Sequence, residues 1–424
     1  MKKLFVIGIA ALLLVAFTMP AMAKVKIGGI IFTDFYYLDR DKNNAARGGY
    51  TGAITGTAIQ VPDITRLYGR WTNEDNVGMY IELGIGQNTG AVRNQTNEGN
   101  GSVHLRHAYG WWDVNPSFQI MAGHTTTPFS PLNPSQLLGT RSGSANIIGI
   151  GYGEYYSGRF PQVRGTFKFG KVARLAVALC DPHGGAGGPW DKYQTGTGTP
   201  YWHIDQATGL NAFYGDPIYE PTLHTNSKIP MISVGVPIYA GPVRIYPGIL
   251  YQHRTIDNAM PAGVNNDLDT MIGSLGAKAG FGPFGVSAEV NYGQNMLNTD
   301  ALIGSGGFGN TAVGLAMASL NNTTGKMNDA KTLGWWVDLN YKFGPITPHV
   351  ILGSLGTKRD NAAGIEQQTT TYMYGVSVPI DLAKGFRIRP ELMWYDNGEL
   401  KTDGAPSVDN GKYMIAGVQF QITF

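Results

Sequence analysis

Apolar and polar residues alternate along the last stretch of the chain, Lys412–Phe424. Every second residue from Met414 to Phe424 is apolar, whereas the residues between them are mostly small or polar. A period of two over this length predicts a β-strand with one apolar and one polar face. A tilted strand of about 9–11 residues crosses a bilayer core of roughly 30 Å. Because strand edges must be paired in lipid, the pattern predicts the closing strand of a barrel.

The same alternation recurs along the whole chain, in segments joined in turn by short turns and long loops. Three of the short turns contain Gly-Pro pairs. The other predicted strands are Val25–Leu38, Ile64–Thr72, Val77–Ile85, Val103–Val114, Phe118–Thr126, Gln162–Phe169, Val172–Asp181, Ile229–Tyr239, Val243–Arg254, Leu268–Phe281, Phe284–Gln294, Lys331–Phe343, Ile346–Thr357, Thr370–Ile380 and Phe386–Asn397. The sequence therefore predicts an all-β fold, a transmembrane antiparallel up-and-down β-barrel of about 16 strands with short periplasmic turns and long extracellular loops. A soluble sandwich or solenoid is the alternative.

The N-terminus predicts secretion. Lys2 and Lys3 precede an apolar run, and Ala21-Met22-Ala23 forms an A-x-A cleavage site, so residues 1–23 are interpreted as a signal peptide. A membrane-anchor helix is the alternative, but the run is short for a span. Residues 24–424 show no linker and are expected to form one barrel domain. The whole chain has 32 basic and 30 acidic residues, two of the former in the signal peptide, and this balance disfavours nucleic-acid binding.

Strand parity assigns side chains to the lipid or to the lumen. Several aromatic residues near the short turns are predicted to face outward and to form an interfacial girdle. They are Trp71, Trp111, Phe169, Phe281, Phe284, Phe343, Phe386 and Phe424. Cations predicted to face the lumen are Arg66, Arg70, Arg106, Arg164, Lys168, Arg174, Arg244, Arg254, Lys278, Lys342, Arg387 and Arg389, and the anions are Glu82, Glu289, Asp338 and Glu391. The cationic excess predicts a weak preference for anions. Alternatively, some arginines only brace the wall by pairing with Glu82 or Glu391.

A family resemblance arises from the architecture and from one junction. The stretch Ala122–Ser130, in which a strand end runs into Pro128-Phe129, resembles the start of the third loop in phosphate-selective and related porins, and the terminal Phe424 fits an assembly signal. The chain thus resembles the trimeric porins of Gram-negative outer membranes. The resemblance implies a homotrimer, handling by the barrel assembly machinery, and an inward-folded constriction loop at 127–147 that includes Pro128, Phe129, Pro131 and Arg141. The loop has no acidic residue before Glu154, so the transverse field of general porins should be weak, and the lysine cluster of the phosphate-specific type is missing.

Other chemistry has little support in the sequence. The histidines and aspartates in the long loop Pro182–Lys228 match no metal-ligand spacing. A Ser-His hydrolase is also disfavoured, because no G-x-S-x-G motif occurs and because His104 and His107 are expected on opposite faces of their strand. The chain is therefore interpreted as a non-enzymatic outer-membrane porin without cofactors, through which small hydrophilic solutes diffuse passively, with anions favoured by the charge of the lumen. Two alternatives remain open: a barrel sheath around a multihaem cytochrome, and a substrate-specific channel.

Overall fold

The structure is a computed structural model that describes most of the chain after residue 23. The described residues are 24–46, 51–62, 64–87, 101–138, 149–155, 158–181, 225–227, 229–256, 267–299, 310–321, 324 and 326–424. The interpretation of residues 1–23 as a signal peptide, the position of Arg141 and almost all of Pro182–Lys228 lie outside these ranges.

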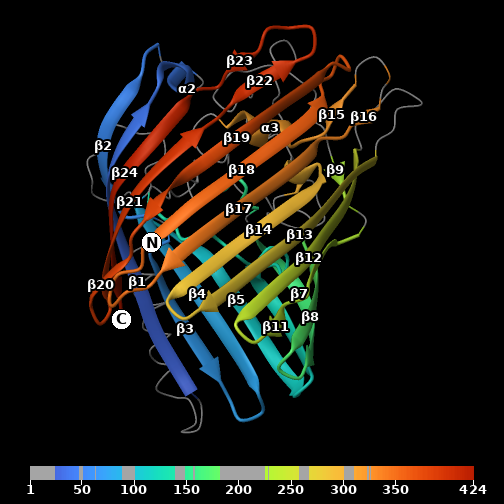
Figure 1. Ribbon diagram of the computed structural model, residues 1–424. Coiled ribbons are helices and arrows are strands. Elements are labelled where there is room, and N and C mark those ends of the chain that lie inside the picture. The colour runs from blue at the N-terminus through green and yellow to red at the C-terminus, as the bar shows by residue number, and fades with distance from the viewer. Residues whose placement is uncertain are drawn as a thin grey trace.

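Antiparallel strands form a closed barrel, as predicted (Figure 1). The described residues contain sixteen spanning strands, some of them broken into shorter segments. In chain order the segments are β1 (Lys24–Arg40), β2 (Ile54–Gln60), β3 (Arg66–Thr72), β4 (Val77–Gln87), β5 (Gly101–Asn115), β6 (Phe118–Thr126), β7 (Arg159–Phe169), β8 (Ala173–Cys180), β9 (Thr225–Asn226), β10 (Met231–Gly235), β11 (Ile238–Ala240), β12 (Val243–Ile256), β13 (Asp267–Phe281), β14 (Phe284–Gln294), β17 (Lys331–Tyr341), β18 (His349–Asp360), β19 (Glu366–Ser377), β20 (Ile380–Ala383), β21 (Phe386–Asp396), β22 (Glu399–Thr402) and β24 (Lys412–Thr423).

The remaining elements are short and belong to the long connections. They are α2 (Lys42–Ala46), η1 (Met296–Asn298), α3 (Thr311–Leu315), and the two-residue strands β15 (Ser319–Leu320), β16 (Met327–Asn328) and β23 (Val408–Asp409). In Figure 1, α2, β15, β16, β22 and β23 lie at the same end of the barrel. None of the helices among the described residues has the length and apolar character needed to cross a membrane.

The first and last strands close the ring. On one side β1 pairs with β24, from Ile30 opposite Thr423 to Arg40 opposite Tyr413. On its other side β1 pairs with both β2 and β3. The terminal strand thus takes the closing position that its alternation predicted.

Glycines in the left-handed conformation make the short turns. The three Gly-Pro turns have φ of 60° at Gly241, 60° at Gly282 and 59° at Gly344. Residues with a Cβ rarely adopt this conformation, and it suits tight hairpins. The predicted alternation of short turns at one end with long loops at the other is confirmed.

Prolines lie at three strand breaks that the alternation does not predict. The predicted loop after the first strand in fact contains β2, which continues the strand formed by β3 beyond a break at Pro62. At this break the Thr65 hydroxyl accepts a hydrogen bond from the Phe32 N–H at 3.0 Å, in place of a ladder partner. The predicted strands Ile229–Tyr239 and Thr370–Ile380 are interrupted at Pro237 and Pro379, because proline has no N–H to donate to a ladder.

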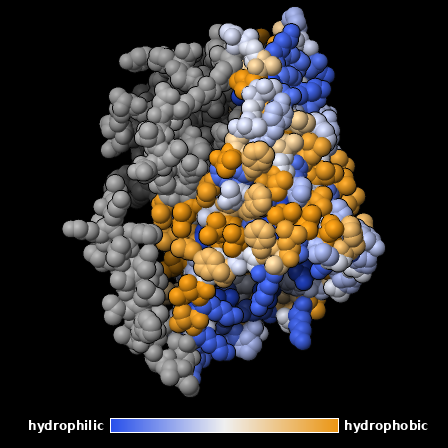
Figure 2. All heavy atoms as spheres, turned by 90° about the vertical axis from the view of Figure 1, so that its left-hand side faces the viewer, coloured by the Kyte–Doolittle hydropathy of each residue, from blue (hydrophilic) through white to orange (hydrophobic). Residues whose placement is uncertain are grey.

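The outer surface carries a belt of exposed apolar side chains. Figure 2 shows this belt as a band between more hydrophilic ends on the face that it displays. Phe169, Phe281, Phe343 and Phe424 are between 51% and 64% exposed and lie toward the short-turn end, as predicted. In β1, Phe32 and Tyr36 point inward and Phe35 points outward.

The assignment of Trp111 to this outer girdle is wrong. A β-bulge interrupts the pairing of β4 with β5, where Glu82 faces His107 and Leu83 faces Leu105. A bulge adds one residue and so exchanges the faces of everything beyond it. Trp111 therefore points into the lumen and Trp112, 48% exposed, points outward. The bulge also places both His104 and His107 on the inner face, which corrects their predicted opposite orientation.

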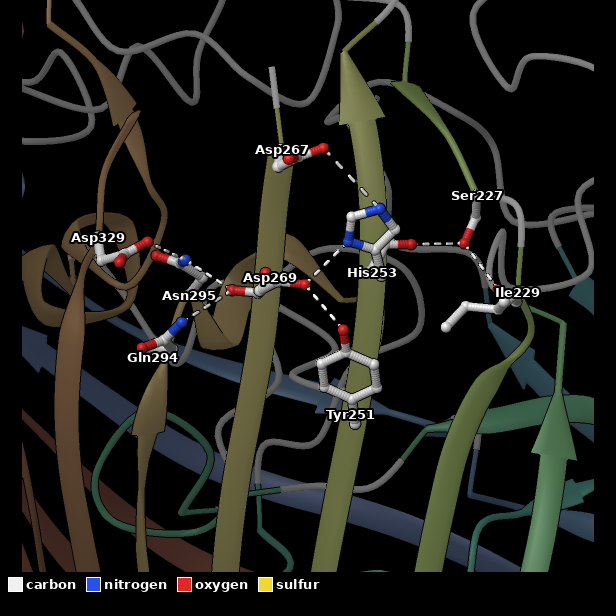
Figure 3. Close-up of polar contacts among 9 residues, drawn as sticks. All are labelled: Ser227, Ile229, Tyr251, His253, Asp267, Asp269, Gln294, Asn295 and Asp329. Atoms are coloured by element: carbon white, nitrogen blue, oxygen red, sulfur yellow. Dashed lines mark hydrogen bonds and ion pairs between the residues drawn. The ribbon is translucent and has the colours of Figure 1, made fainter. Parts of the chain in front are cut away.

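Polar side chains end the outer belt at the long-loop end of β12 and β13 (Figure 3). The Asp269 carboxylate accepts hydrogen bonds from Tyr251 at 3.0 Å and pairs with His253 Nδ1 at 2.9 Å. Asp267 lies 4.0 Å from the other ring nitrogen of His253. These residues alternate with buried, inward-facing Leu250 and Leu268, so they mark the boundary of the apolar belt.

Candidate functional site

The segment after β6 turns into the barrel and lies against its inner wall. Phe129 is fully buried and packs edge-on against Tyr155, with 5.5 Å between the ring centroids. The Pro128 carbonyl lies so close to Gly235 that a Cβ there would be 2.2 Å from the oxygen. The Leu132 side chain lies over Gly276 of β13, where a Cβ would be 3.0 Å from Leu132 Cδ1. Glycines on the inner face thus leave the room that this segment occupies.

A second segment, residues 149–155, lies against the neighbouring part of the wall. The Tyr152 carbonyl contacts Gly353 of β18, where a Cβ would be 2.2 Å from the oxygen. The Tyr152 hydroxyl donates a 2.6 Å hydrogen bond to Asn397 Oδ1. The Gly151 carbonyl accepts from Thr371 Oγ1 at 2.9 Å. The inward segment, defined here as residues 127–138 and 149–155, therefore touches the wall from β10 to β24.

Carboxylates of the wall hold the inward segment. Asp338 accepts a hydrogen bond from the Ser135 N–H at 2.8 Å, and Glu391 accepts from the Leu138 N–H at 2.7 Å. Glu289 accepts from the Ser130 hydroxyl at 2.6 Å. An irregular segment has backbone N–H groups without ladder partners, and acceptors must be supplied when it is buried. Sequence parity identified these carboxylates as inward-facing but missed this anchoring.

The inward segment adds little negative charge to the lumen. Among its described residues, the inward segment has one acidic side chain, Glu154, which is 2% exposed. Burial and the neighbouring Glu289 raise the pKa of Glu154 well above its usual value, which favours the uncharged carboxyl. This geometry agrees with the weak transverse field expected from the sequence.

A row of arginines lines the wall from β3 to β7, away from these loop contacts. The Arg106 guanidinium lies 2.7 Å from Glu82 Oε1, and Arg66 lies 3.9 Å from the other Glu82 oxygen. Arg164 donates to Gln162 Oε1 at 2.7 Å and to the Thr126 carbonyl. Two of the predicted lumen cations are thus also bracing groups, since Glu82 carries one charge for two arginines.

More cations lie at the short-turn end of the lumen. Lys168 faces Arg174 across β7 and β8, and Arg244 faces Lys278 across β12 and β13. The guanidinium groups of Arg174 and Arg244 lie 5.8 Å and 5.9 Å from the centre of the Tyr239 ring. Lys168 pairs with Asp113. Within the described part of the chain, Arg174, Arg244 and Lys278 form no salt bridge. Like charges opposite one another are unfavourable in a sheet, so this grouping points to a role for the charge.

The remaining predicted site residues are distributed as follows. Arg387 pairs with Asp381 at 2.6 Å near the short turns, and Arg389 is buried beside Gln419. Pro131 is exposed and Phe424 is 64% exposed at the end of the closing strand. In the described ranges no group of three or more His, Cys, Asp or Glu side chains could hold a metal ion.

Loss of the Arg106 side chain is expected to destabilise the barrel. In Arg106→Ala, the buried Glu82 keeps the hydrogen bond from Tyr80, but the nearest arginine is then Arg66 at 3.9 Å. Breaking a buried ion pair from one side costs about 3–5 kcal/mol. The double variant Arg106→Ala, Glu82→Leu should recover much of the lost free energy of unfolding, because it leaves no unpaired carboxylate in the wall. Urea unfolding in detergent, followed by tryptophan fluorescence, measures both. Equal stability of Arg106→Ala and the unaltered protein would contradict this account of the pair.

Comparisons with solved structures identify the fold. The chain is similar to the outer-membrane channel DcaP of Acinetobacter baumannii, with a TM-score of 0.61 and 17% identity over 96% of this chain and 99% of that one. It is also similar to an anion-selective porin from Comamonas acidovorans, with a TM-score of 0.54 and 15% identity over 95% and 100% of the two chains. For the trimer form of OmpT, an outer-membrane protein of Vibrio cholerae, the TM-score is 0.51 and the identity 10%, over 95% and 100%. No protein-family model and no curated protein sequence matches the chain. The fold is therefore that of the outer-membrane porins.

Proposed function

We propose that this chain is an outer-membrane porin, a water-filled channel through which small hydrophilic solutes and ions diffuse passively. The observation that carries the proposal is a closed barrel with an apolar outer belt, a charged inner wall and a segment that lies inside the lumen on that wall. A barrel of about sixteen strands is wide enough to leave an aqueous bore. The three solved structures compared above are described as an outer-membrane channel, an anion-selective porin and an outer-membrane protein.

The outer membrane is the location that fits the chain. Residues 1–23 would direct secretion, and the barrel at 24–424 would then be inserted by the barrel assembly machinery, with Phe424 as its terminal signal. The apolar belt would face lipid, and the exposed aromatics at its short-turn end would lie at the interface. A homotrimer is proposed as the assembly, and a trimer form is known for OmpT of the same fold.

The proposed constriction consists of residues 127–147. Its described part, 127–138, lies inside the barrel with Phe129 buried on the wall, and 149–155 extends the same covering layer. A layer of backbone on one side of the bore narrows the path for solutes. Size exclusion would therefore operate beside the arginine-lined wall of β3–β7.

A weak preference for anions is proposed from the charges of the lumen. The wall carries Arg174, Arg244 and Lys278 outside salt bridges within the described residues, while three wall carboxylates are engaged in holding the inward segment. Fixed cations raise the local anion concentration and lower the barrier for anions. The anion-selective porin from Comamonas acidovorans has the same fold.

The sheath hypothesis is less compatible with this geometry. A barrel that encloses a multihaem cytochrome needs an open lumen, whereas here the inward segment is pinned to the wall by hydrogen bonds from Ser135 and Leu138. The passive channel is therefore preferred.

Reconstitution of the purified chain into planar lipid bilayers tests the proposal. We expect stepwise current increases in KCl, and a reversal potential in a KCl gradient that indicates a modest excess of chloride over potassium permeability. Absence of current from correctly folded protein would overturn the channel. Clear cation selectivity would overturn the anion preference alone.

A further inference from the structure

A continuous track of aromatic rings runs along the inner wall of β3, β4 and β5. The ring centroids are 6.1 Å apart for Tyr68 and Tyr80, 5.6 Å for Tyr80 and Tyr109, and 5.9 Å for Tyr109 and Trp111. His107 lies 6.0 Å from Tyr80. These spacings are those of interacting aromatic pairs. The aromatic track, defined as Tyr68, Tyr80, Tyr109 and Trp111, is half-buried on the lumen side, so ring faces remain open to the bore.

A glycine lets the track reach the short-turn end. Gly78 lies opposite Trp111 in the β4–β5 register, and a Cβ on Gly78 would be 2.2 Å from the Trp111 ring. The indole therefore lies over the wall instead of standing away from it. The Arg70 guanidinium is 4.9 Å from the centre of this ring, which is within the range of a cation–π contact. Arg70 is exposed, so its hydrogen-bond donors are available to a solute that lies on the indole.

Charged groups accompany the rings at their other end as well. Tyr80 donates a 2.6 Å hydrogen bond to Glu82, and the same carboxylate is paired with Arg106 at 2.7 Å. Arg159 lies on the neighbouring wall and donates to His107 Nε2 at 3.2 Å. Guanidinium groups thus lie beside both ends of the track, and a guanidinium fork is suited to a carboxylate.

Ring packing within the wall does not by itself explain this arrangement. Aromatic side chains on a barrel are favourable at the lipid interface, where one part is apolar and the other wet. Here four rings are placed on the watery face instead, in contact with one another and next to cations. A path for inorganic ions needs charge but no apolar faces.

We propose that the aromatic track with its flanking arginines is a binding path for carboxylates that carry a ring with an apolar face. The ring of the solute lies on Trp111, Tyr109 or Tyr80, and its carboxylate binds Arg70 or a guanidinium at the other end. The inference rests on the proposed channel function and specifies the class of solute. Two sources share this chemistry, aromatic acids and cyclic sugar acids.

The experiment separates ring from charge in the reconstituted channel. The concentration that halves the KCl current is measured for benzoate, glucuronate, acetate and benzamide. Ring stacking and a charged hydrogen bond each add to binding, so benzoate, glucuronate or both should act at a concentration about tenfold lower than acetate and benzamide. Whichever of the two is stronger identifies the source. Equal potency of all four probes in a conducting channel would overturn the inference, whereas a missing KCl current would contradict the channel itself.

Variants locate the effect on the track. Tyr109→Leu and Arg70→Gln should each raise the half-blocking concentration of the stronger ring acid by about threefold to tenfold. In Tyr109→Leu the half-blocking concentration of acetate should stay nearly unchanged. Tyr109→Phe keeps the ring and should behave as the unaltered protein. Tyr292→Leu, at a tyrosine 59% exposed on the outer face, is the matched control. An equal loss in Tyr292→Leu, or none in Tyr109→Leu, would overturn the assignment to the track.

Discussion

Replacing Gly353 with valine is expected to push the inward segment off the wall and to increase single-channel conductance. Gly353 lies on the inner face of β18, and a Cβ there would be 2.2 Å from the Tyr152 carbonyl oxygen. This oxygen belongs to the backbone, so it cannot rotate away from the new side chain. The contacts of the segment with Asn397 and Thr371 would be strained together. Conductance should rise by roughly one and a half to two times, because a barrel of this size is wide without an inserted segment.

Gly356→Val on the same strand is the matched control. Apart from the two residues next to it in sequence, the nearest atom to a Cβ on Gly356 would be Thr370 Oγ1, at 3.4 Å. Gly356 therefore does not touch the inward segment. Both variants should show β-sheet circular dichroism and the gel migration of folded barrels. If folded Gly353→Val conducts like Gly356→Val, the inward segment does not set the size of the pore.

The strands could be predicted because each spanning strand has one face toward lipid and one toward water. This constraint imposes alternation, and alternation is visible in the sequence. It fails where the backbone departs from the regular ladder. Pro62, Pro237 and Pro379 divide strands that appear continuous in the pattern. The bulge beside Leu105 exchanges the faces of the rest of β5 and brings Trp111 inward, and no local signal in the sequence gives the partner register that produces it.

The candidate pore could be predicted only in part. Parity placed Arg66, Asp338 and Glu391 on the inner wall, where the structure has them. It could not give their partners. The hydrogen bond from Leu138 to Glu391 joins residues 253 positions apart, and such a contact leaves no periodic trace. The aromatic track was missed for the same reason, since its four rings come from three strands and one of them had been assigned to the opposite face.

Neutralising three cations at the short-turn end is expected to reduce the anion preference. Arg174, Arg244 and Lys278 are exposed to the lumen and form no salt bridge within the described residues. Their charge is therefore not compensated by the wall, in contrast to Arg106 beside Glu82. The triple variant Arg174→Gln, Arg244→Gln, Lys278→Gln should lower the ratio of chloride to potassium permeability by about two- to threefold. Removal of the repulsion between Arg244 and Lys278, which face each other across β12 and β13, should leave stability unchanged or raise it slightly.

Reversal potentials in a KCl gradient measure this ratio, and their dependence on salt tests the mechanism. The difference between the triple variant and the unaltered protein should shrink at high salt, because the Debye length falls from about 10 Å at 0.1 M to about 3 Å at 1 M. Lys358→Gln is the control, since Lys358 is an exposed lysine paired with Glu366 at 2.5 Å near the long loops. A change of equal size in Lys358→Gln would mean that net charge, rather than charge inside the bore, sets the selectivity. An unchanged ratio in the triple variant would show that selection occurs elsewhere in the channel, and the arginines of β3, β5 and β7 would then be the groups to neutralise next.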